Sequence, residues 1–508
     1  MAQKEEQPPF VAPAGAPQAP LVLALDVGTS STRALLFDAR GSVVPDIVSQ
    51  HKYQLTTSNG GEVSVDADML ADLVAQTIDE VLQAAGPLAQ QIKAVALDTF
   101  WHSLLGVDAR NHPLTPVITW EDTRAFAATL DLRKRLDEQE VHRRTGAGFH
   151  ASYWPAKLLW LSQSQPDTYK QVAQWISFGE YLHRKFLGRS ICSLSMASAT
   201  GMLNTRARRW DADLMQMLQV SPQQLPDPGD MRDSIQGLSS EYANRWSVLR
   251  DALWFPAIGD GASACVGSGC ASSENWSLTV GTSSAIRVVV PVDDIEPPPG
   301  LWLYLIDGKR GVIGGALSEG GNLVAWIENT LKMSALKDLE AEARKLSPDA
   351  HGLTILPFIS GERSLGWHAD ARMTISGISI HTSPADLLRA AMEALAYQLH
   401  AVYTQLHSTL KVRAPRLLSS GGALYSSDLL RSIIADTLDT PVHPSRDREA
   451  SARGGALLAL EAMGLIEDIA KVAPHLDGPI NPNKEAGEIY RRAAKRQEGL
   501  YHLLLGER

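Results

Sequence analysis

Two stretches of the chain place glycine and hydroxyl-bearing residues directly after an apolar run: "DVGTSSTRALLFD", beginning at Asp26, and "TVGTSSAIRVVV", beginning at Thr279. Because glycine has no Cβ, Gly28 and Gly281 permit a tight turn in which backbone N–H groups converge on an anion. The same two turns carry further donors to phosphate oxygens, the hydroxyl groups of Thr29, Ser30, Ser31, Thr282 and Ser283. The near-copy predicts that the two turns are halves of one phosphate clamp.

Two charged residues accompany the first turn. Arg33 offers a planar guanidinium that matches phosphate geometry. Asp26 ends a predicted strand, at the edge where open α/β sheets bind ligands, and a carboxylate beside phosphates favours Mg²⁺. The alternative is a pair of ordinary hairpin turns, in which Gly, Ser and Thr are common; the duplication favours the clamp. The sequence has neither a GxxxxGKS/T phosphate loop nor GxGxxG after its first strand, so a nucleotide site would use another scaffold.

The stretch "AIGDGASACVG" presents a candidate general base, Asp260. Gly259 and Gly261 on either side let the backbone bend sharply and direct the carboxylate into a cleft. An alcohol that attacks a γ-phosphoryl group needs a base to receive its proton and to orient its oxygen. The alternative is a turn aspartate without catalytic work, which is the commoner meaning of Gly-Asp-Gly out of context.

The elements that position these residues follow an α/β order. Short apolar strands are predicted at Leu21–Val27 and at residues 92–98, with a helix between them that stops at Gly86. The strand–turn–strand pattern restarts at Thr279, and a long helix is predicted from Pro384 to Leu410. The repeated opening predicts two related halves, with a boundary between residues 255 and 275. The middle, from about residue 130 to 250, is predicted to be mostly helical.

Composition narrows the class of protein. A chain of 508 residues is too long for one typical core and favours two domains. A net charge of −10 argues against a nucleic-acid partner. Three cysteines without metal-site spacing favour a reducing, cytoplasmic location, and the lack of a long apolar run predicts no membrane span. Residues 1–20, rich in alanine and proline, lack the apolar core of a signal peptide and are predicted to be a disordered tail.

Six motifs, in matching order and spacing from about Leu21 to Gly464, resemble the FGGY carbohydrate kinases. They are "DVGTSSTRALLFD", "GDGASACVG", "TVGTSS", "GGNLVAWI", "LPFISGERSLGWHADARMTISGIS" and "SSGGALYSSDLLRSIIADTLDTPV". The resemblance implies an α/β fold of two ribonuclease H-like domains, as in actin-like ATPases and sugar kinases, around a central cleft. Residues 21–268 would bind the sugar and carry the first phosphate hairpin, and residues 269–508 would bind the nucleotide.

The resemblance also implies a reaction and its cofactors. A carbohydrate kinase transfers the γ-phosphate of ATP, with Mg²⁺, to a hydroxyl group of a sugar. Asp260 would be the catalytic base and Asp26 would help to hold Mg²⁺. Beside the two clamp turns and Arg33, the predicted nucleotide contacts are Gly321, Gly422 and Ser426. Ser420 replaces the usual third glycine of the "GGALYSS" loop.

The sugar site is expected in the first domain, where relatives contact the polyol. Tryptophan stacks on the C–H face of a sugar and histidine bonds hydroxyl groups, which fits Trp101 and His102 in "DTFWHSLLGVD". The other predicted contacts, from "TPVITWEDTRA" and "GAGFHASYWPAK", are Trp120, Glu121, Asp122, Arg124, His150 and Lys157. The alternatives are core packing for the Trp-His pair and a solvated helix start, capped by Thr119 or Asp122, for the acidic cluster.

The choice of sugar rests on few side chains. The pattern Trp-x-Asp-x-Arg is similar to that of gluconate kinases within the family, so D-gluconate is the leading substrate, with xylulose and ribulose as alternatives. Arg124 could pair with a gluconate carboxylate, with Asp122 or with a hydroxyl group. A regulatory pseudokinase or an actin-like ATPase would keep the fold without sugar phosphorylation. The expected partner is a small sugar or sugar acid, and a homodimer is left open.

Overall fold

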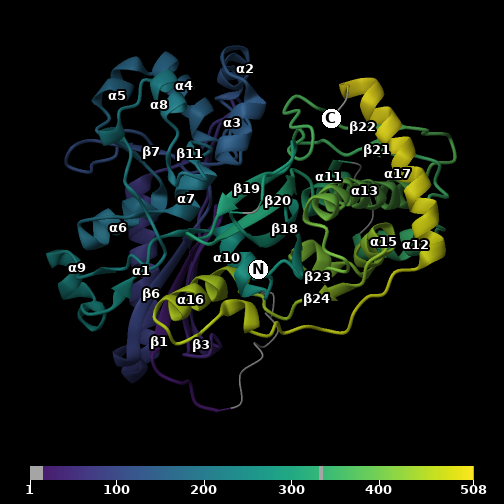
Figure 1. Ribbon diagram of the computed structural model, residues 1–508. Coiled ribbons are helices and arrows are strands. Elements are labelled where there is room, and N and C mark those ends of the chain that lie inside the picture. The colour runs from purple at the N-terminus through teal and green to yellow at the C-terminus, as the bar shows by residue number, and fades with distance from the viewer. Residues whose placement is uncertain (1–14, 294, 331–335, 507–508) are drawn as a thin grey trace. The chain divides into compact units, whose positions relative to one another are not determined.

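The computed structural model describes residues 15–293, 295–330 and 336–506, which form two compact units (Figure 1). The first unit contains the chain up to Gly267 and two later segments, Tyr304–Arg310 and Glu449–Val472. The second unit contains Ser268–Leu303, Gly311–Arg448 and the chain from Ala473 onward. The break after Gly267 lies between residues 255 and 275, and two segments that the prediction gave to the second half belong to the first unit.

The first unit is built on a seven-stranded sheet of order β14-β15-β6-β1-β2-β3, with β16 also paired to β6. β1 is antiparallel to β2 and parallel to β6. The strands are β1 (Leu21–Val27), β2 (Ser31–Phe37), β3 (Val43–Lys52), β6 (Ile92–Thr99), β14 (Ile235–Gln236), β15 (Leu253–Trp254) and β16 (Ile258–Gly259). The strands β1 and β6 are almost wholly buried, as their continuous apolar runs predict.

The second unit repeats this arrangement in a six-stranded sheet of order β19-β20-β18-β17-β23-β24. Here β17 is antiparallel to β18 and parallel to β23, as β1 is to β2 and β6. The strands are β17 (Asn275–Val280), β18 (Ser284–Pro291), β19 (Trp302–Leu305), β20 (Arg310–Leu317), β23 (Arg416–Ser420) and β24 (Val442–Pro444). The repeated sequence opening thus corresponds to a repeated strand arrangement.

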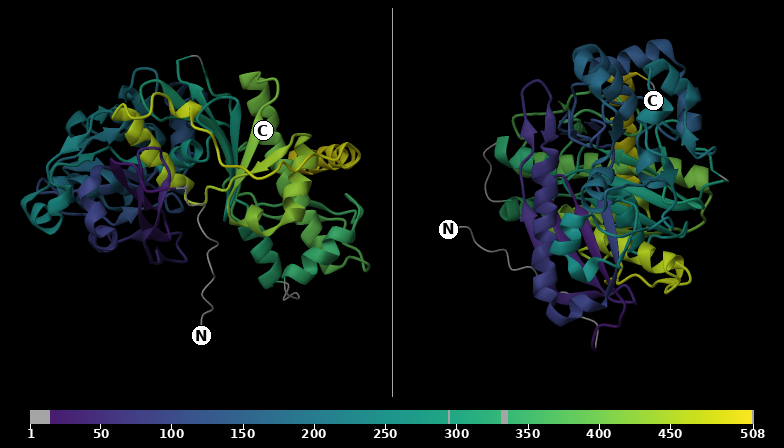
Figure 2. Two further views of the ribbon diagram at one scale, coloured as in Figure 1. Left: turned by 90° about the horizontal axis from the view of Figure 1, so that it is seen from below. Right: turned by 90° about the vertical axis from the view of Figure 1, so that its left-hand side faces the viewer.

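Helices α1, α10 and α16 pack around the first sheet. In α1 (Ala67–Ala85) the Asp66 side chain accepts from the Met69 N–H and Gly86 ends the helix, as predicted. α16 (Ala450–Ala462) packs on β1 and β6, and Figure 2 shows its yellow ribbon beside the purple strands. α10 (Asp260–Gly267) lies against α16 in backbone contact, because a Cβ on Gly267 would stand only 1.8 Å from the Ala450 carbonyl oxygen. This packing explains why a C-terminal helix belongs to the first unit.

The middle of the chain adds a helical layer to the first unit. Its helices are α2 (Phe126–Arg135), α3 (Glu138–Thr145), α4 (Trp154–Ser164), α5 (Pro166–Gln171), α6 (Phe178–Leu187), α7 (Leu194–Ala199), α8 (Ala212–Leu218) and α9 (Ser240–Arg245). Short strands separate them, β7 (Leu105–Val107), β8 (Val117–Ile118), β9 (Gln174–Ile176), β10 (Cys192–Ser193), β11 (Leu203–Asn204), β12 (Arg209–Trp210) and β13 (Pro228–Gly229), while β4 (Thr56–Thr57) and β5 (Val63–Val65) precede them. Loops and these strands occupy much of residues 130–250, so the mostly helical prediction holds only in part.

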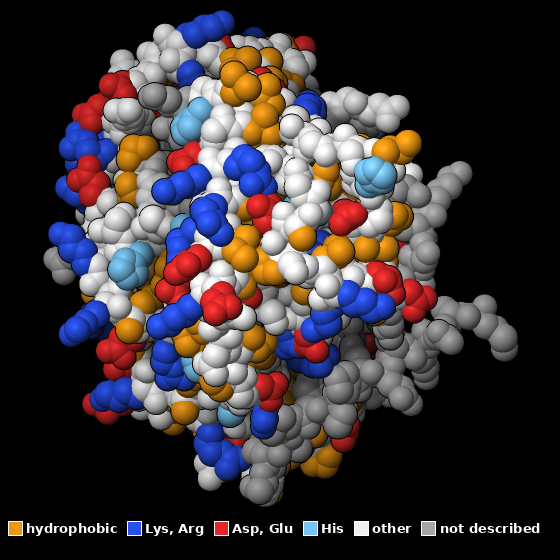
Figure 3. Space-filling view, turned by 90° about the vertical axis from the view of Figure 1, so that its right-hand side faces the viewer, with side chains coloured by type: hydrophobic (Ala, Val, Ile, Leu, Met, Phe, Trp, Pro, Cys, Tyr) orange, Lys and Arg blue, Asp and Glu red, His pale blue; other side chains and the backbone are white. Residues whose placement is uncertain are grey.

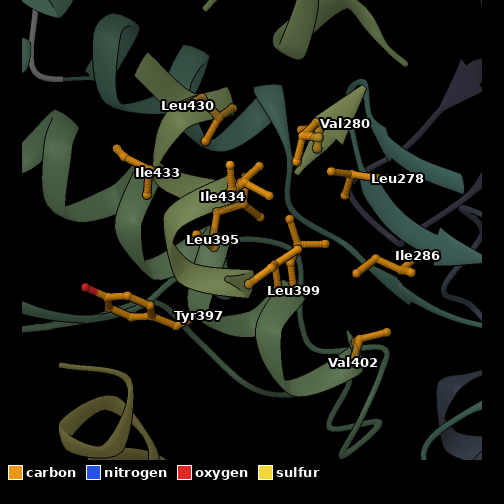
Figure 4. Close-up of a cluster of buried hydrophobic side chains, with 14 of the residues drawn as sticks. Leu278, Val280, Ile286, Leu395, Tyr397, Leu399, Val402, Leu430, Ile433 and Ile434 are labelled. Carbon is orange, nitrogen blue, oxygen red and sulfur yellow. The ribbon is translucent and has the colours of Figure 1, made fainter. Parts of the chain in front are cut away.

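The core of the second unit is centred on α13 (Pro384–Leu410), whose bounds agree with the prediction. Ser383 and Asp386 form a capping box at its start, and Pro384 occupies the first helical position. Figure 4 shows side chains of β17, β18, α13 and α15 gathered into this core. The remaining elements are α11 (Gly321–Thr330), α12 (Leu336–Lys345), α14 (Gly422–Ser426), α15 (Asp428–Leu438), α17 (Lys484–Leu505), β21 (Thr354–Leu356) and β22 (Thr374–Ser376).

The surface carries both signs of charge. On the face in Figure 3, Lys and Arg side chains are interspersed with Asp and Glu, a mixture typical of a solvated surface. Among the helices of the described residues, none is both long and apolar enough to cross a bilayer. Residues 1–14 of the predicted disordered tail lie outside the described residues. At the end of that tail, Gln18 exchanges hydrogen bonds with the turn at Asp38 and Ala39.

Candidate active site

Three aspartates lie at the carboxyl ends of neighbouring strands in the first unit. β1 and β6 are parallel, and Asp26 stands opposite Asp98 in their register. β16 also pairs with β6 in parallel. The residue that follows β16 is Asp260, the first residue of α10. Asp98 is buried, whereas Asp26 and Asp260 are partly exposed. The sheet therefore brings together the predicted metal ligand, the predicted base and a third carboxylate that we did not predict.

Burial raises the pKa of two of these acids, Asp26 and Asp98. Burial raises the pKa of Asp26 to about 6, against the attraction of Arg33, and the charges of Glu449 and Asp260 add to the rise. Burial, followed by the charges of Asp26 and Asp260, raises the pKa of Asp98 well above its ordinary value. Asp98 therefore keeps its proton to a higher pH than an ordinary aspartate does.

The first hairpin turn lies beside Asp26. The Gly28 N–H donates to the Ser31 carbonyl at 3.0 Å and closes the turn, and the contact of this turn with an anion remains a prediction. The Tyr53 hydroxyl donates to the Gly28 carbonyl at 2.5 Å from the other side. At the tip, the Thr29 hydroxyl lies 3.5 Å from a carboxylate oxygen of Glu121. Ser30 is exposed and Ser31 is partly exposed, so the hydroxyl groups of the turn reach the surface.

Arg33 follows the turn on β2. Its guanidinium forms an ion pair of 2.8 Å with Glu449, which precedes α16. With the Gln50 amide in its better orientation, the same guanidinium also donates to the Gln50 side-chain oxygen. Arg33 is therefore held within the first unit by these partners, and its predicted phosphate contact remains a prediction.

Trp101 covers the Gly-Asp-Gly turn that carries Asp260. A Cβ on Gly259 would stand 1.7 Å from the Trp101 Nε1, and a Cβ on Gly261 would stand 2.3 Å from the Cζ3 of the same ring. Neither glycine has a positive φ. The sharp bend that we predicted is therefore not the reason for these glycines. They leave the space that an indole ring needs to pack against the backbone of Asp260.

His102, the second predicted sugar contact, is held on several sides. Its φ is +65°, a left-handed conformation that is uncommon for a residue with a side chain. The ring Nδ1 is 2.5 Å from the Ala199 carbonyl oxygen, so Nδ1 carries the proton in this contact. The buried Lys157 Nζ donates to the His102 carbonyl at 2.7 Å. The Tyr153 ring stands edge-on to the His102 ring at 5.0 Å.

Trp120 and His150 join the same neighbourhood through Ser152. The Ser152 hydroxyl donates to the Trp120 carbonyl at 2.7 Å and lies 3.0 Å from the His150 Nδ1. The His150 ring also lies 6.4 Å from the ring of Tyr153. Tyr153 therefore links His150 to His102.

Asp122 and Arg124 pair with each other. The Arg124 Nη2 donates to Asp122 at 2.7 Å and the Nε donates to both of its carboxylate oxygens. A second acid, Glu62, lies 3.3 Å from Arg124, and the guanidinium stacks over Trp160 at 4.6 Å. Asp122 is buried and also accepts from the Val63 N–H. Of the alternatives for Arg124, the structure shows the pair with Asp122.

The second unit brings three glycine-containing segments together. The Gly321 N–H donates to the Gly281 carbonyl at 2.7 Å, and a Cβ on Gly320 would stand 2.7 Å from the Ser283 carbonyl oxygen. Gly421 has a φ of +105°, and its Cβ would stand 2.4 Å from the Val280 carbonyl. The turn after β17, the start of α11 and the loop after β23 are therefore in backbone contact.

The predicted nucleotide residues occupy different parts of this glycine cluster. The Gly281 N–H closes its own hairpin by donating to the Ser283 carbonyl, and the anion contact of this turn also remains a prediction. A Cβ on Gly281 or Gly422 would meet no atom within 4 Å, so both positions border open space. Thr282 is exposed at the tip of the turn. Ser426 is exposed one turn further along α14 and its hydroxyl donates to the Ala423 carbonyl.

The residues of the two units fit the implied cofactors. No N–H or O–H group of the described residues donates to either oxygen of the buried Asp98, and carboxylate oxygens are the ligands that Mg²⁺ prefers. The open spaces at Gly281 and Gly422 are of the kind that lets a ligand approach the backbone closely. Asp26 with Asp260 in the first unit suits a divalent cation, and the glycine cluster of the second unit suits a nucleotide.

A further cluster of acids and a histidine lies in the second unit, away from these residues in the sequence. The His351 Nε2 is 3.0 Å from Glu393, and Arg389 donates to Glu393 at 2.8 Å. Arg496 of α17 donates to Asp349 at 2.5 Å. Two arginines thus balance the acids, so the cluster joins α13 to α17 and is structural.

Sequence reasoning missed three neighbours of the site. Asp98 could have been found, because it ends a buried strand adjacent to the strand of Asp26. Tyr153 lay inside a quoted motif but carried no distinguishing pattern. Tyr304, whose ring lies 5.1 Å from Trp101, is separated from it by about 200 residues and no sequence signal points to it.

Comparisons with known proteins agree over nearly the whole chain. Residues 21–267 match the N-terminal domain, and residues 276–463 the C-terminal domain, of the FGGY family of carbohydrate kinases. The gluconokinase of Bacillus subtilis (strain 168) is 25% identical over 483 residues, 92% of this chain and 93% of that protein. Two crystal structures from Lactobacillus acidophilus, a gluconate kinase and a ligand-bound xylulose kinase, each superpose with a TM-score of 0.88 at 26% identity. Each superposition covers 95% of this chain and 98% of the other.

These matches span both units, and they agree with the repeated strand arrangement, the strand-end aspartates and the glycine-lined cluster. Members of this family are phosphotransferases that use ATP, generally with Mg²⁺. The chain therefore belongs to the FGGY family of carbohydrate kinases and is an ATP-dependent kinase of a small carbohydrate.

Proposed function

We propose that the protein transfers the γ-phosphate of MgATP to a hydroxyl group of D-gluconate. The observation that supports the site most strongly is the contact between Trp101 and the backbone around Asp260. The Trp101 ring, which we take as the ring that stacks on the sugar, packs against the glycines on either side of the proposed base. Because both lie beside the strand-end acids Asp26 and Asp98, one unit contains the sugar contacts and the carboxylates that the transfer requires.

Each acid has its own task in this proposal. Asp260 accepts the proton of the attacking hydroxyl group, whose oxygen forms the new bond to phosphorus as the bond to ADP breaks. Asp26 holds the cation, and Asp98 lies beside it near the end of the neighbouring strand. Bound MgATP supplies the phosphoryl group and the positive charge that offsets its oxygens. Thr29 and Thr282, at the tips of the two hairpins, donate hydroxyl groups to phosphate oxygens.

The two units divide the ligands in this proposal. The first unit binds the sugar acid through Trp101, His102, Trp120 and His150. The second unit binds the nucleotide, with the open spaces at Gly281 and Gly422 admitting phosphates and base, while Gly321 and Ser426 line the same cluster.

Gluconate is favoured among the sugars by the relatives and by the Trp-x-Asp-x-Arg segment. Gluconokinases of two Bacillus species are among the relatives, and one of the two crystal structures from Lactobacillus acidophilus is a gluconate kinase. A second candidate is D-xylulose, because the ligand-bound xylulose kinase superposes equally well. Arg124 remains a predicted contact of the gluconate carboxylate, although its guanidinium already pairs with Asp122 and Glu62.

A coupled assay of ADP release with D-gluconate, D-xylulose, D-ribulose and glycerol tests the proposal. We expect kcat/KM for gluconate to exceed that for each other compound by about tenfold or more. A preference for xylulose would replace gluconate as the substrate. Absence of sugar-dependent ADP release with all four would refute the proposed function.

Arg124→Gln then tests how a carboxylate would be recognised. A direct contact predicts a rise in KM for gluconate of about tenfold with little change for xylulose, because only gluconate carries a carboxylate. If Arg124 serves only to hold Asp122 and Glu62, KM for both compounds changes to the same extent.

A further inference from the structure

The segment Tyr304–Arg310 brings an aromatic residue from the middle of the chain into the first unit. The Tyr304 ring stands edge-on to Trp101 at 5.1 Å and to His102 at 5.6 Å. Its hydroxyl group lies 2.5 Å from that of Tyr153. Edge-to-face contacts of this kind stabilise aromatic pairs beyond the area that they bury. Tyr304 therefore contacts both predicted sugar-binding side chains.

Three further contacts hold this segment in the first unit. The Leu305 N–H donates to the Ser198 hydroxyl oxygen at 2.8 Å. The Gly308 N–H donates to Asp230 at 2.7 Å. Arg310 forms an ion pair of 2.6 Å with Glu461 at the end of α16. Along its whole length the turn between β19 and β20 is thus built into the first unit.

The short helix α7 connects the segment to the site. Its Ser198 accepts from Leu305, and the next residue, Ala199, accepts from the His102 ring. At the other end of α7, the Ser195 hydroxyl oxygen accepts from the Gly259 N–H at 3.2 Å. One helix therefore holds the Asp260 turn, the His102 ring and the residue after Tyr304.

The conformation of His102 explains why such support matters. A left-handed backbone at a residue with a side chain is strained, and it persists only where its surroundings determine it. Lys157 holds the His102 carbonyl and Ala199 holds the ring Nδ1. The rings of Tyr153 and Tyr304 stand edge-on to the imidazole. The tyrosine pair thus limits how far the imidazole can turn.

We propose that Tyr304 is a positioning residue of the sugar site, and that the segment Tyr304–Arg310 is a structural part of that site. Tyr304 acts through Trp101 and His102, which its ring packs, and through Tyr153, with which its hydroxyl pairs. This inference rests on the proposed function, because it takes Trp101 and His102 as contacts of the sugar. Loss of Tyr304 should therefore weaken sugar binding and leave nucleotide binding intact.

Steady-state kinetics of Tyr304→Phe and Tyr304→Ala test the inference. The phenylalanine variant keeps the ring and removes the hydroxyl pair, so we expect KM for the sugar to rise about three- to tenfold. The alanine variant also removes the ring contacts, and we expect a rise of about 30-fold or more. KM for ATP should stay within about twofold in both variants.

Tyr169→Phe is the matched control. Tyr169 lies in α5 of the same unit, and its hydroxyl donates to the Leu218 carbonyl at 3.0 Å. This change removes one hydrogen bond of a half-buried tyrosine, so it reports a loss of stability without a link to the sugar. We expect a lower melting temperature and an unchanged KM for the sugar.

The outcomes separate the two claims. If the wild-type protein prefers another sugar, the same measurements with that sugar decide the inference. If neither Tyr304 variant raises KM for the sugar more than Tyr169→Phe does, the inference is wrong and the kinase assignment stands. If Tyr304→Ala does not fold, Tyr304→Phe decides alone. A wild-type protein that phosphorylates no sugar refutes the proposed function and, with it, the inference.

Discussion

The glycines on either side of Asp260, Gly259 and Gly261, leave space for a neighbouring side chain. The indole of Trp101 packs where the Cβ atoms of Gly259 and Gly261 would stand, and it fixes the backbone that carries the carboxylate. Asp98 stands opposite Asp26 in the register of β1 and β6, and its burial, with the charges of Asp26 and Asp260, raises its pKa. The predicted base is therefore held by a neighbouring ring, and the predicted metal ligand lies beside a buried acid.

Lys157 gives a test at this scale through the pH dependence of stability. Burial lowers its pKa to about 7, with Asp122 opposing the shift, so the amine is mostly neutral above pH 7 in the folded protein. The unfolded chain keeps the proton up to its ordinary pKa of 10.5. Between these values the unfolded state binds more protons, so the free energy of unfolding should rise with pH. One group contributes about 1.4 kcal/mol per pH unit.

Urea denaturation between pH 7 and 10 measures this dependence. Lys157→Met should be less stable at pH 10, because the carbonyls of His102 and Ile118 lose their donor. Its free energy of unfolding should also rise with pH less steeply than that of the wild type. Equal slopes would show that Lys157 does not lose its proton on folding.

At the scale of elements, α16 packs both on the first sheet and on α10. Its Gly454 faces α10, and a Cβ there would stand 1.8 Å from the Ser263 carbonyl oxygen. Its neighbour Gly455 faces the sheet, where a Cβ would stand 3.5 Å from the Ala96 Cβ, an ordinary contact. The backbone of α10 therefore leaves no room for a methyl group at Gly454, whereas a methyl group fits at Gly455.

Gly454→Ala and Gly455→Ala form a matched pair that tests this packing. The first change forces α10 and α16 apart and should destabilise the protein by about 3 kcal/mol. The second gains helix propensity and should change stability by less than about 1 kcal/mol in either direction. Thermal melts measure both. Equal losses from the two variants would mean that the helices do not meet at Gly454.

The sequence predicted the elements better than their contacts. The strand–turn–strand repeat, the long helix from Pro384 to Leu410 and two of the three strand-end aspartates, Asp26 and Asp260, could be read from local patterns. The reason for the glycines could not, since Trp101 and Gly259 are far apart in the chain and only the fold brings them together. The partner of Arg124 could not be decided from the sequence, because a guanidinium can bind the carboxylate of a substrate as well as that of the neighbouring Asp122. Tyr304 could not be found, since its segment joins the first unit through contacts with α7 and α16.

At the scale of the whole molecule, two units repeat one strand arrangement and carry different chemistry. The first unit holds the acids and the aromatic residues, and the second holds the glycine cluster. The chain passes between the units several times, because Tyr304–Arg310 and Glu449–Val472 belong to the first. We therefore expect each ligand to protect its own set of segments.

Hydrogen exchange with each ligand alone tests this division. Gluconate should slow exchange at residues 101–102, 259–261 and 304–310, and ATP should slow it at residues 281–283, 320–322 and 421–423. The reason is that a ligand protects the backbone that it contacts or orders. Protection of the glycine cluster by gluconate alone would contradict the proposed division of the ligands.

The most direct test of the central claim is the turnover of Asp260→Asn. If Asp260 accepts the proton of the sugar, sugar-dependent ADP release should fall by about a thousandfold, while the dissociation constant of ATP, measured by calorimetry, stays within about twofold. Asp251→Asn, at an exposed position of the same unit, serves as the control and should keep full activity. Turnover by Asp260→Asn near the wild-type rate would contradict the account.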